Sequence, residues 1–380
     1  MSSEDLPTLT HGQGSRVHGT DGREWIDLVT GYGAVFLGHS HPQVTQALQW
    51  QAGRLIACGR YPTARFDAVE ALLATVLPAG LRLGGFASSG MEAAEFAMRV
   101  AATHTGRSEF AGFGRSMHGK SAMTASLCWA NAPVKPAGLH TLPFVDAQEE
   151  PAILEALERL LRARPIAALF IEPVQGTNGA HRASPAFYAE AIRLCHAHAS
   201  LCVMDEILTG LYRTGPAFTS STLAVSPDML LFAKNMGNGF PVSAMALAPH
   251  VQVAAQALPG STFAGNPLAL TAVEATLTAM ASLRMGALVQ ELERVARDQL
   301  GRLQERGIQL RGQGALWCLE LDQRIDLPRA LAGIRDAGIL VTCNAHTLRL
   351  LPAATLDPAE WADACNRIAD ACLAARVLKA

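Results

Sequence analysis

The chain has 380 residues, of which 49% are apolar and 17% are charged, a composition that builds a large buried core and excludes a disordered protein. Its net charge of −2 gives no electrostatic reason to expect a nucleic acid or an anionic membrane as partner. No apolar run approaches the ~18 residues of a membrane helix, and the N-terminus lacks the basic start and apolar core of a signal peptide. The eight cysteines form no C-x-x-C pair, which is typical of reduced core residues in a cytoplasmic protein.

The N-terminal part of the chain predicts a hairpin followed by helices. Residues 16–29 carry two short apolar stretches on either side of Asp21-Gly22, a strong turn signal. Apolar residues then recur with a helical period and predict three helices, at 42–57, 65–77 and 91–103.

From about residue 110 to 250, strand-like and helix-like segments alternate. Strands are expected at 167–174, 201–204, 229–233 and 242–247. One helix, at 184–198, separates the first two strands, and Pro151 and Pro165 bracket another. This βαβ pattern predicts a mainly parallel sheet covered by helices. The rest of the chain predicts a small α+β domain, with helices at 266–285, 286–306, 327–337 and 357–376 and strands at 315–321 and 347–351.

Three of the expected strands end in ionisable residues, Glu172, Asp205 and Lys234. Ligands of open α/β sheets gather at the carboxyl ends of the strands, so these side chains are expected at one edge. Lysine, unlike arginine, can lose its proton and form a Schiff base, and this chain has only four lysines. An amine and a carboxylate at one sheet edge are what a pyridoxal phosphate site needs. A solvated loop lysine and buried structural acids are the alternative interpretations.

A serine- and glycine-led helix start offers a place for the phosphate. Ser88-Ser-Gly-Met91 opens the helix expected at 91–103 and would present free backbone N–H groups. The same pattern is common in ordinary N-caps, so it does not define a site by itself. Its combination with Lys234 and Asp205, in this order along the chain, favours the cofactor hypothesis.

The chain resembles the class III (ornithine and ω-amino acid type) aminotransferases, and in particular their glutamate-1-semialdehyde aminomutase branch. The resemblance covers about residues 17 to 355, and its motifs follow one another in the family's order. The matching segments are Gly38-His-Ser-His-Pro42, Ser88-Ser-Gly-Met-Glu-Ala93, His118-Gly119, Ile171-Glu-Pro-Val-Gln-Gly176, Met204-Asp-Glu-Ile-Leu-Thr-Gly210, Ala233-Lys-Asn-Met-Gly-Asn-Gly-Phe-Pro241, Gly260-Ser-Thr-Phe-Ala-Gly-Asn-Pro267 and Leu348-Arg-Leu-Leu-Pro352.

The resemblance implies the α/β fold of pyridoxal phosphate enzymes of fold type I, with a mainly parallel seven-stranded sheet in a large domain and a small α+β domain. The boundaries expected from it are 1–40 for an N-terminal hairpin segment that packs with the small domain, 41–265 for the large cofactor-binding domain and 266–380 for the small domain.

The family's residue roles carry over where the motifs match. Lys234 would hold the cofactor and move a proton during the reaction, and Asp205 would pair with the pyridine nitrogen. Arg349 would bind the carboxylate of a substrate, with a structural salt bridge between the domains as the alternative. The other expected cofactor contacts are Ser89, Gly90 and Met91 at the phosphate, Met117 and Ile207 on the ring faces, His118 near the ring, Glu172 in a supporting position, and Ser261 and Thr262 from the neighbouring subunit of a homodimer with shared active sites.

Four positions depart from the family pattern. Met117 stands where an aromatic residue usually stacks on the ring, and Met91 removes a hydroxyl from the phosphate site. Leu208 replaces a glutamine of ornithine-type members, which the semialdehyde and ω-amine branches also often lack, and Thr177 replaces their acidic gate. These changes weaken ornithine, acetylornithine and GABA as candidate substrates. Only about fifteen residues precede the hairpin, and such a short cover suits a bulky or carrier-presented acceptor.

The resemblance therefore implies a pyridoxal phosphate-dependent aminotransferase that moves an amino group from an amino donor to a ketone, aldehyde or oxo-acid, with pyridoxamine phosphate as the intermediate form of the cofactor. Alternatives on the same fold are an aminomutase of the glutamate-1-semialdehyde type, a racemase or a decarboxylase. A more remote alternative is a cofactor-binding protein with a structural role and no catalysis. No metal, nucleic acid or membrane is expected, a carrier protein stays open as a partner, and the donor and acceptor are not identified by the sequence.

Overall fold

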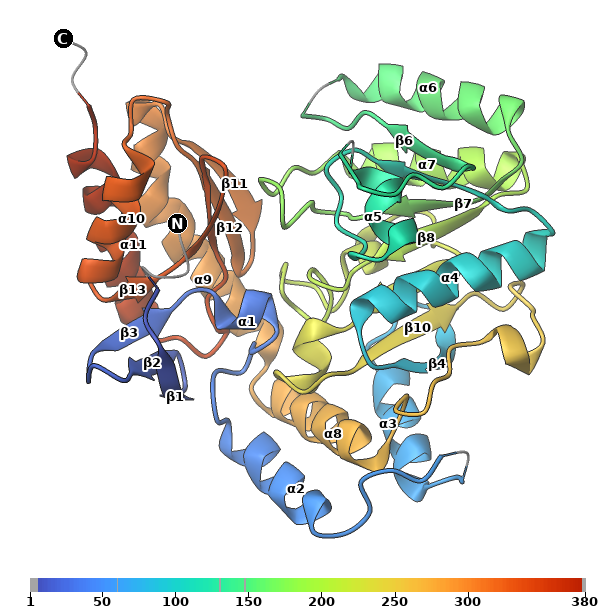
Figure 1. Cartoon of the computed structure of the whole chain (residues 1–380), viewed down its shortest axis with the longest axis horizontal. Coiled ribbons are helices and arrows are strands. Elements are labelled where there is room, and N and C mark those ends of the chain that lie inside the picture. Colours follow the sequence, from blue (N-terminus) through green and yellow to red (C-terminus); the bar gives the residue numbers. More distant parts are fainter. Residues whose placement is uncertain (1–5, 60, 130, 147, 378–380) are drawn as a thin grey trace.

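The computed structural model of the chain describes residues 6–59, 61–129, 131–146 and 148–377. Figure 1 shows a large domain built around one sheet and a smaller domain beside it. This arrangement confirms the expected α/β fold with a mainly parallel seven-stranded sheet and a small α+β domain. The start of the N-terminal segment, residues 1–5, and Lys379 lie outside the described residues.

The large sheet is parallel except at one strand. Its strands lie in the order β4 (Arg82–Ala87), β10 (Ser243–Leu247), β9 (Met229–Phe232), β8 (Leu201–Asp205), β7 (Ile166–Ile171), β5 (Glu109–Phe113) and β6 (Leu139–Leu142). Strand β10 is antiparallel to both of its neighbours, and the pairs from β9 to β6 are parallel. Every residue of β7, β8, β9 and β10 is buried, as expected for strands with helices on both faces.

Alternate residues of the central strands pack against different layers of helices. In β7, Leu169 and Ile171 pack with α6 (Glu150–Ala163) and α7 (Pro185–Ala197), whereas Ala168 and Phe170 pack with α4 (Gly90–Thr105) and α5 (Ala122–Cys128). The period of two follows from the strand geometry, which sends successive side chains to opposite faces. The sheet is therefore the middle layer of a three-layer core.

Three helices form a further group at the side of the large domain. Helix α8 (Pro267–Ser282) contacts α2 (Pro42–Ala52) and α3 (Ala64–Ala74), and Figure 1 shows the three beside the β4 edge of the sheet. Helix α2 starts with Pro42, which is well suited to the first helical turn, and ends at Ala52 before Gly53. The chain thus returns to the large domain through α8 before it enters the small one.

The small domain is a four-stranded antiparallel sheet covered by helices. The strand order is β11 (Gln309–Gln313), β12 (Leu316–Glu320), β15 (Thr347–Leu350) and β14 (Thr342–Asn344). The helices are α9 (Met285–Leu300), α10 (Leu327–Asp336) and α11 (Pro358–Ala374), and α11 packs against the other two. Trp317 and Trp361 are buried in this core, and each indole N–H donates to a backbone carbonyl, of Gly314 and Leu292 respectively.

The N-terminal hairpin joins the small domain through a shared sheet. Strands β1 (Leu9–Gln13), β2 (Arg16–Gly19) and β3 (Glu24–Asp27) are antiparallel, and β3 pairs in parallel with β13 (Ile339–Leu340). The next segment, α1 (Thr30–Gly33), is a single left-handed turn, with φ of 45° at Thr30 and 57° at Tyr32. Short 3₁₀ helices complete the described elements: η2 (Thr219–Thr222), η3 (Lys234–Gly237), η4 (Ala255–Ala257) and η5 (Gly301–Arg306).

All eight cysteines lie in the described residues and none forms a disulfide; six are buried, while Cys58 and Cys343 are partly exposed. Within the described part of the chain no single helix is long and apolar enough to cross a membrane, although α8 together with α9 and η5, bent by 69°, passes that test on length and composition alone.

Candidate active site

Three neighbouring parallel strands bring the expected ionisable residues to one edge of the sheet. Asp205 is the last residue of β8, Glu172 follows β7 directly, and Lys234 opens the turn η3 after β9. Glu172 and Asp205 are buried, and Lys234 lines a cavity of about 360 Å³. The other residues that line this cavity are Ala34, Ser88, Ser89, Gly90, Met91, Met117, His118, Gly119, Ile207, Ala233, Gly239, Phe240, Pro241 and Val242.

The Asp205 carboxylate is held in place by two hydrogen bonds. His118 Nδ1 lies 2.7 Å from Asp205 Oδ2, and the backbone N–H of Ile207 donates to Oδ1 at 3.0 Å. Burial alone would lower the pKa of His118, but Cys128 and Asp205 outweigh it and raise that pKa well above its ordinary value. His118 Nε2 is buried and has no hydrogen-bond partner among the described residues. Asp205 itself is not among the residues that line the cavity, but His118 and Ile207, which do line it, hold its carboxylate in a fixed place next to it.

The surroundings of Lys234 favour a neutral amine. Burial lowers the pKa of Lys234 to about 8, against the raising effect of Asp205 and Glu172, and Arg349 and Arg213 lower it further. A neutral amine is the form that attacks a carbonyl carbon, and an unperturbed lysine holds little of it near pH 7. The lowered pKa therefore suits Lys234 for a covalent bond to an aldehyde.

Glu172 contacts the backbone of a residue that lines the cavity. Its carboxylate accepts a hydrogen bond from the backbone N–H of Met117, which lines the cavity. Burial raises the pKa of Glu172 to about 7, with a lowering effect of His118 and a raising effect of Asp205. The sequence left open whether Glu172 is a supporting residue or a satisfied buried acid, and its bond to Met117 is compatible with both roles.

The N-terminus of α4 forms another part of the cavity wall. Ser89 is its N-cap: Ser89 Oγ accepts from Glu92 N at 3.3 Å, and Glu92 Oε2 accepts from the N–H groups of Ser88 and Ser89. This capping box leaves the N–H groups of Gly90 and Met91 in the first turn without such a bond. Ser88 Oγ is buried and lacks a partner among the described residues.

Gly90 allows this helix start to approach the neighbouring loop closely. A Cβ atom at Gly90 would lie 2.8 Å from Ile207 Cδ1, which is closer than real side chains come. Ile207 and Met117 line the cavity with Lys234, so the two expected ring-packing side chains are brought together. Met117 provides a flexible thioether in the place of a flat aromatic surface.

Ser261 and Thr262 are exposed and are not among the residues that line this cavity. They lie in the turn before α8, next to Phe263, which is 65% exposed. Their expected contact is with the site of a second chain, so their role stays a prediction.

Arg349 reaches from the small domain toward the large one. From β15, its Nη1 donates to the carbonyl oxygen of Gly176 at 3.2 Å and its Nε to Thr342 Oγ1 at 3.3 Å. Among the described residues Arg349 makes no ion pair, so the alternative of an interdomain salt bridge has no acidic partner there. Burial lowers the pKa of this guanidinium, with smaller opposite effects from Cys318, Tyr32 and Glu172.

The sequence analysis missed two residues, one beside Arg349 and one beside the Lys234 turn. Tyr32, in the left-handed turn α1, is 63% exposed, and the Arg349 guanidinium carbon lies 5.7 Å from the centre of its ring. Its position between Gly31 and Gly33 was the available signal, because paired glycines mark an unusual backbone. Arg213 is fully buried beside Asn235, and an arginine in the turn Thr209–Gly215 gave no sign of its partners in distant parts of the chain.

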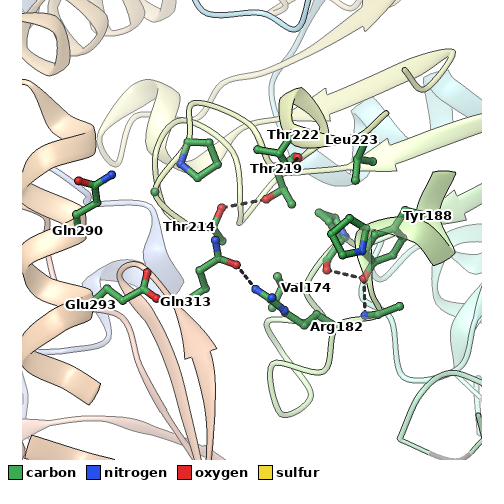
Figure 2. Close-up of a pocket in the computed structure, with 15 residues that line it drawn as sticks. Val174, Arg182, Tyr188, Thr214, Thr219, Thr222, Leu223, Gln290, Glu293 and Gln313 are labelled. Carbon is green, nitrogen blue, oxygen red and sulfur yellow. Dashed lines mark hydrogen bonds between the residues drawn. The ribbon is translucent and has the colours of Figure 1, made fainter. Parts of the chain in front are cut away.

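A second cavity lies between the domains. It has a volume of about 460 Å³ and is bounded by the 214–223 loop and α7 on one side and by α9 and Gln313 on the other (Figure 2). Arg182 donates a hydrogen bond to Gln313 across it, as the dashed line in Figure 2 shows. None of the residues expected at the cofactor site lines this cavity.

The cavity at Lys234 fits pyridoxal phosphate. It pairs an amine of lowered pKa with a fixed carboxylate, and it has a helix N-terminus with free N–H groups for the phosphate. Ser88 Oγ and His118 Nε2 are buried without a hydrogen-bond partner among the described residues, and contact with a bound cofactor would account for both. Fold and site together define a pyridoxal phosphate enzyme of fold type I.

Comparisons with known proteins narrow this class. The family described as aminotransferase class-III matches residues 2–372, and the chain belongs to it. It is 35% identical over 364 residues to the [LysW]-aminoadipate semialdehyde transaminase of Deinococcus radiodurans, covering 92% of this chain and 82% of the relative. It is 32% identical to the 2-aminoadipate transaminase of Pseudomonas putida, covering 97% and 95%, and 31% identical to the acetylornithine aminotransferase of Methanosarcina mazei, covering 90% and 86%.

Solved structures agree with the fold. The ornithine aminotransferase of Toxoplasma gondii superimposes with a TM-score of 0.86 at 26% identity, covering 99% of this chain and 92% of that one, and its description reports pyridoxal phosphate at the active site. A transaminase from the marine bacterium Virgibacillus superimposes with a TM-score of 0.90 at 20% identity, covering 97% and 93%. The chain is thus a pyridoxal phosphate-dependent aminotransferase.

Proposed function

We propose that this aminotransferase takes its amino group from an amino-acid donor, whose carboxylate Arg349 binds, and delivers it to an aldehyde or oxo-acid acceptor. Two features together carry the proposal. Lys234 has a pKa of about 8, and Arg349 makes no ion pair among the described residues. A guanidinium recognises a carboxylate through two parallel hydrogen bonds. Such a clamp would hold an α-amino acid with its amino group toward Lys234.

The catalytic roles go to Lys234 and Asp205. Pyridoxal phosphate supplies a carbonyl carbon that bonds to amines and a ring that takes up electrons. Lys234 would hold this cofactor and then transfer the proton at the substrate carbon as general base and acid. Asp205, fixed by His118 and Ile207 N, would hold the proton of the pyridine nitrogen.

The remaining contacts follow from the positions in the cavity. Met117 and Ile207 would cover the ring, and Glu172 would keep the Met117 backbone in place. Ser89 and the N–H groups of Gly90 and Met91 would hold the phosphate at the start of α4.

The test is a donor screen on the cofactor-loaded enzyme. Loss of the cofactor absorbance on adding glutamate or alanine, and its return on adding an acceptor aldehyde, supports the proposal. An absorbance that no amine changes would instead favour the non-catalytic interpretation.

For the acceptor, we propose an aldehyde on a bulky or carrier-linked molecule. This proposal rests on the likeness to a relative whose name states a LysW-linked semialdehyde, and on Thr177 in the place of an acidic gate beside Gly176. A screen should compare LysW-linked aminoadipate semialdehyde with the N-acetylated semialdehydes of glutamate and aminoadipate. A clear preference in kcat/KM for the N-acetylated compounds would refute the carrier.

An aminomutase of the glutamate-1-semialdehyde type is the alternative. Leu208 stands in place of a glutamine that this branch also often lacks, and it is a packing residue here: it is buried with Val174 and Leu316, and a Cβ at Gly33 or Gly176 would collide with it. An aminomutase isomerises its substrate without a separate donor. Formation of 5-aminolevulinate from glutamate-1-semialdehyde in the absence of any donor would select this alternative.

We further propose a homodimer in which Ser261 and Thr262 hold the phosphate of the partner subunit. Their exposure and that of Phe263 support it, because a large exposed apolar side chain in such a turn is suited to an interface. Thr262→Ala should weaken cofactor binding by about tenfold, the effect of one lost hydrogen bond to a charged group. In a mixed dimer of Thr262→Ala and Lys234→Ala chains, one site would be intact and should bind cofactor with wild-type affinity. An active monomer, or a mixed dimer without a tight site, would contradict the shared site.

The domain boundaries and the cellular location are also proposals. The sequence placed the start of the small domain at residue 266; we propose instead a start between α8 and α9, because α8 contacts α2 and α3. Residues up to about 40 stay assigned to the segment that pairs with β13. Free cysteines in a buried core are typical of the reducing cytoplasm, which we propose as the location. Limited proteolysis with mass mapping, and fractionation of cells, test the two proposals.

A further inference from the structure

Arg213 is a buried cation held almost entirely by neutral groups. It is fully buried, and its guanidinium donates to the carbonyl oxygens of Ala315 at 3.1 Å, of Pro352 at 2.8 Å and of Gly33 at 2.8 Å. No ion pair of Arg213 occurs within the described residues, and burial together with Arg349 lowers its pKa to about 9. At neutral pH it still carries its charge, in a place where an uncompensated charge is unfavourable.

The partners of Arg213 come from separate parts of the molecule. Ala315 and Pro352 belong to the small domain, and Gly33 belongs to the turn that precedes the large domain. Arg213 Nη2 also reaches Asn235 Oδ1 at 3.4 Å, and Asn235 Nδ2 donates to the carbonyl oxygen of Gly210 at 2.8 Å. Asn235 directly follows Lys234, so these hydrogen bonds hold the neighbour of the residue that bears the reactive amine.

The contact with the small domain is close and runs in both directions. The carbonyl oxygen of Arg213 accepts from Ala315 N at 2.8 Å, and a Cβ at Gly314 would lie 2.5 Å from that oxygen. The second cavity begins directly beyond, lined by Thr214 and Gly215 (Figure 2). Because this cavity separates the two domains, Arg213 is one of the residues that connect the small domain to the Lys234 turn.

We propose that Arg213 is a positioning residue of the transamination reaction, which fixes the Lys234 turn against the small domain and brings its positive charge to that turn. The proposal rests on the proposed role of Lys234. A turn that is tied to the small domain keeps Lys234 in register with Arg349, which approaches from that same domain. Substrate carboxylate and reacting carbon are then held by parts of the protein that move as one.

The positive charge of Arg213 also affects the reactive amine, because it lowers the pKa of Lys234. Four charged groups affect Lys234 besides its burial: Asp205 and Glu172 raise its pKa, and Arg349 and Arg213 lower it. Burial is the main cause of the lowered pKa, and the two arginines add smaller effects that counter part of the raising effect of the two acids. Loss of the Arg213 charge should make that nitrogen hold its proton to higher pH.

The variants Arg213→Gln and Arg213→Lys separate charge from geometry. The absorbance of the bound cofactor reports protonation of the Lys234 nitrogen, so its pH midpoint is read in the cofactor-loaded full-length enzyme. We expect a midpoint raised by roughly 0.5 to 1 pH unit in Arg213→Gln and little changed in Arg213→Lys, which keeps the charge. In both variants kcat should fall about tenfold or more, with KM for the donor within about threefold, because the reacting groups are displaced while the substrate still binds.

Arg107→Gln is the matched control. The Arg107 guanidinium also donates to backbone carbonyl oxygens, of Ile166 at 3.0 Å and His198 at 2.9 Å, at the opposite edge of the sheet. The Arg107→Gln variant should have a lower melting temperature, with the pH midpoint of the cofactor absorbance and kcat both unchanged. Variants of Arg213 that behave in the same way would overturn the proposal and leave Arg213 a structural residue. If Arg213→Gln does not fold, Arg213→Lys decides: a wild-type kcat overturns the proposal. The pH titration of the cofactor absorbance in the wild-type enzyme tests the role of Lys234 alone. A wild-type enzyme without such a midpoint would contradict the proposed function, whatever the Arg213 variants do.

Discussion

Replacement of Arg349 by alanine tests the binding of the donor carboxylate. Its guanidinium makes two hydrogen bonds with described residues, to Gly176 O and Thr342 Oγ1, both longer than 3.1 Å. Among the described residues Nη2 donates no hydrogen bond, so part of the fork is available to a ligand. Arg349→Ala should therefore affect mainly substrates that carry a carboxylate.

The magnitude follows from the kind of bond that is lost. Hydrogen bonds to a charged group contribute about 1.5 to 3 kcal/mol, which corresponds to about a 10- to 140-fold decrease in kcat/KM at 1.4 kcal/mol for each factor of ten. This loss should be seen for glutamate and alanine as donors and should enter largely through KM. Simple amines without a carboxylate should change by less than about threefold.

The control for this experiment is Arg311→Ala. Arg311, on β11, donates to the carbonyl oxygen of Gly179 at 2.7 Å and pairs with Glu320, so it also ties the small domain to the loop after β7. Loss of this tie should leave the preference between amino acids and amines unchanged. If Arg349→Ala decreases kcat/KM equally for both classes of donor, or resembles Arg311→Ala, the clamp is refuted and Arg349 is a structural residue.

Three further predictions concern the cofactor. Lys234→Ala should abolish turnover in a folded chain, and borohydride reduction of the wild type should label Lys234; label at Lys120 or Lys135 would place the covalent bond elsewhere. Asp205→Asn should keep the cofactor bound but lose most of the activity, since the ring nitrogen is then less protonated; a near wild-type rate would make Asp205 a mere strand end. Because the pKa of Lys234 is lowered from 10.5 to about 8, the neutral amine increases as the pH rises, and capture of cofactor by the cofactor-free enzyme should accelerate about tenfold between pH 7 and 9 and then level off. A rate still rising at pH 10 would show an ordinary lysine.

The meeting of Glu172, Asp205 and Lys234 at one edge could be predicted because it depends on local patterns alone. Each residue ends an apolar run, and parallel strands place their carboxyl ends together. The same reasoning gave the long helices and the buried strands, whose periodicity is strong. The antiparallel direction of β10 could not be predicted in this way, since a fully buried strand has the same pattern in either direction.

Contacts between distant residues could not be read from patterns. The bond between His118 and Asp205 spans 87 positions, and those from Arg213 to Ala315 and Pro352 span 102 and 139. Nothing in the neighbourhood of Arg213 in the sequence distinguishes it from a solvated loop arginine. The identity of such partners depends on how the two domains close on each other, which only the assembled fold determines.

Strand β10 lies between β4 and β9, and it therefore sets the distance between the ends of these two strands. Strand β4 leads to the helix start at Ser88 and Ser89, β9 leads to Lys234, and Ser243 at the start of β10 donates a hydrogen bond to the carbonyl oxygen of Ser89 at 2.8 Å. Two spacings between neighbouring strands measure roughly 10 Å, so backbone hydrogen bonds fix the separation between the strand end that leads to Lys234 and the strand end that leads to α4. Side-chain substitutions in the cavity can change what fits beside the ring, but they leave this span unaltered. A cofactor that reaches from Lys234 to the start of α4 must therefore match a separation that the sheet sets.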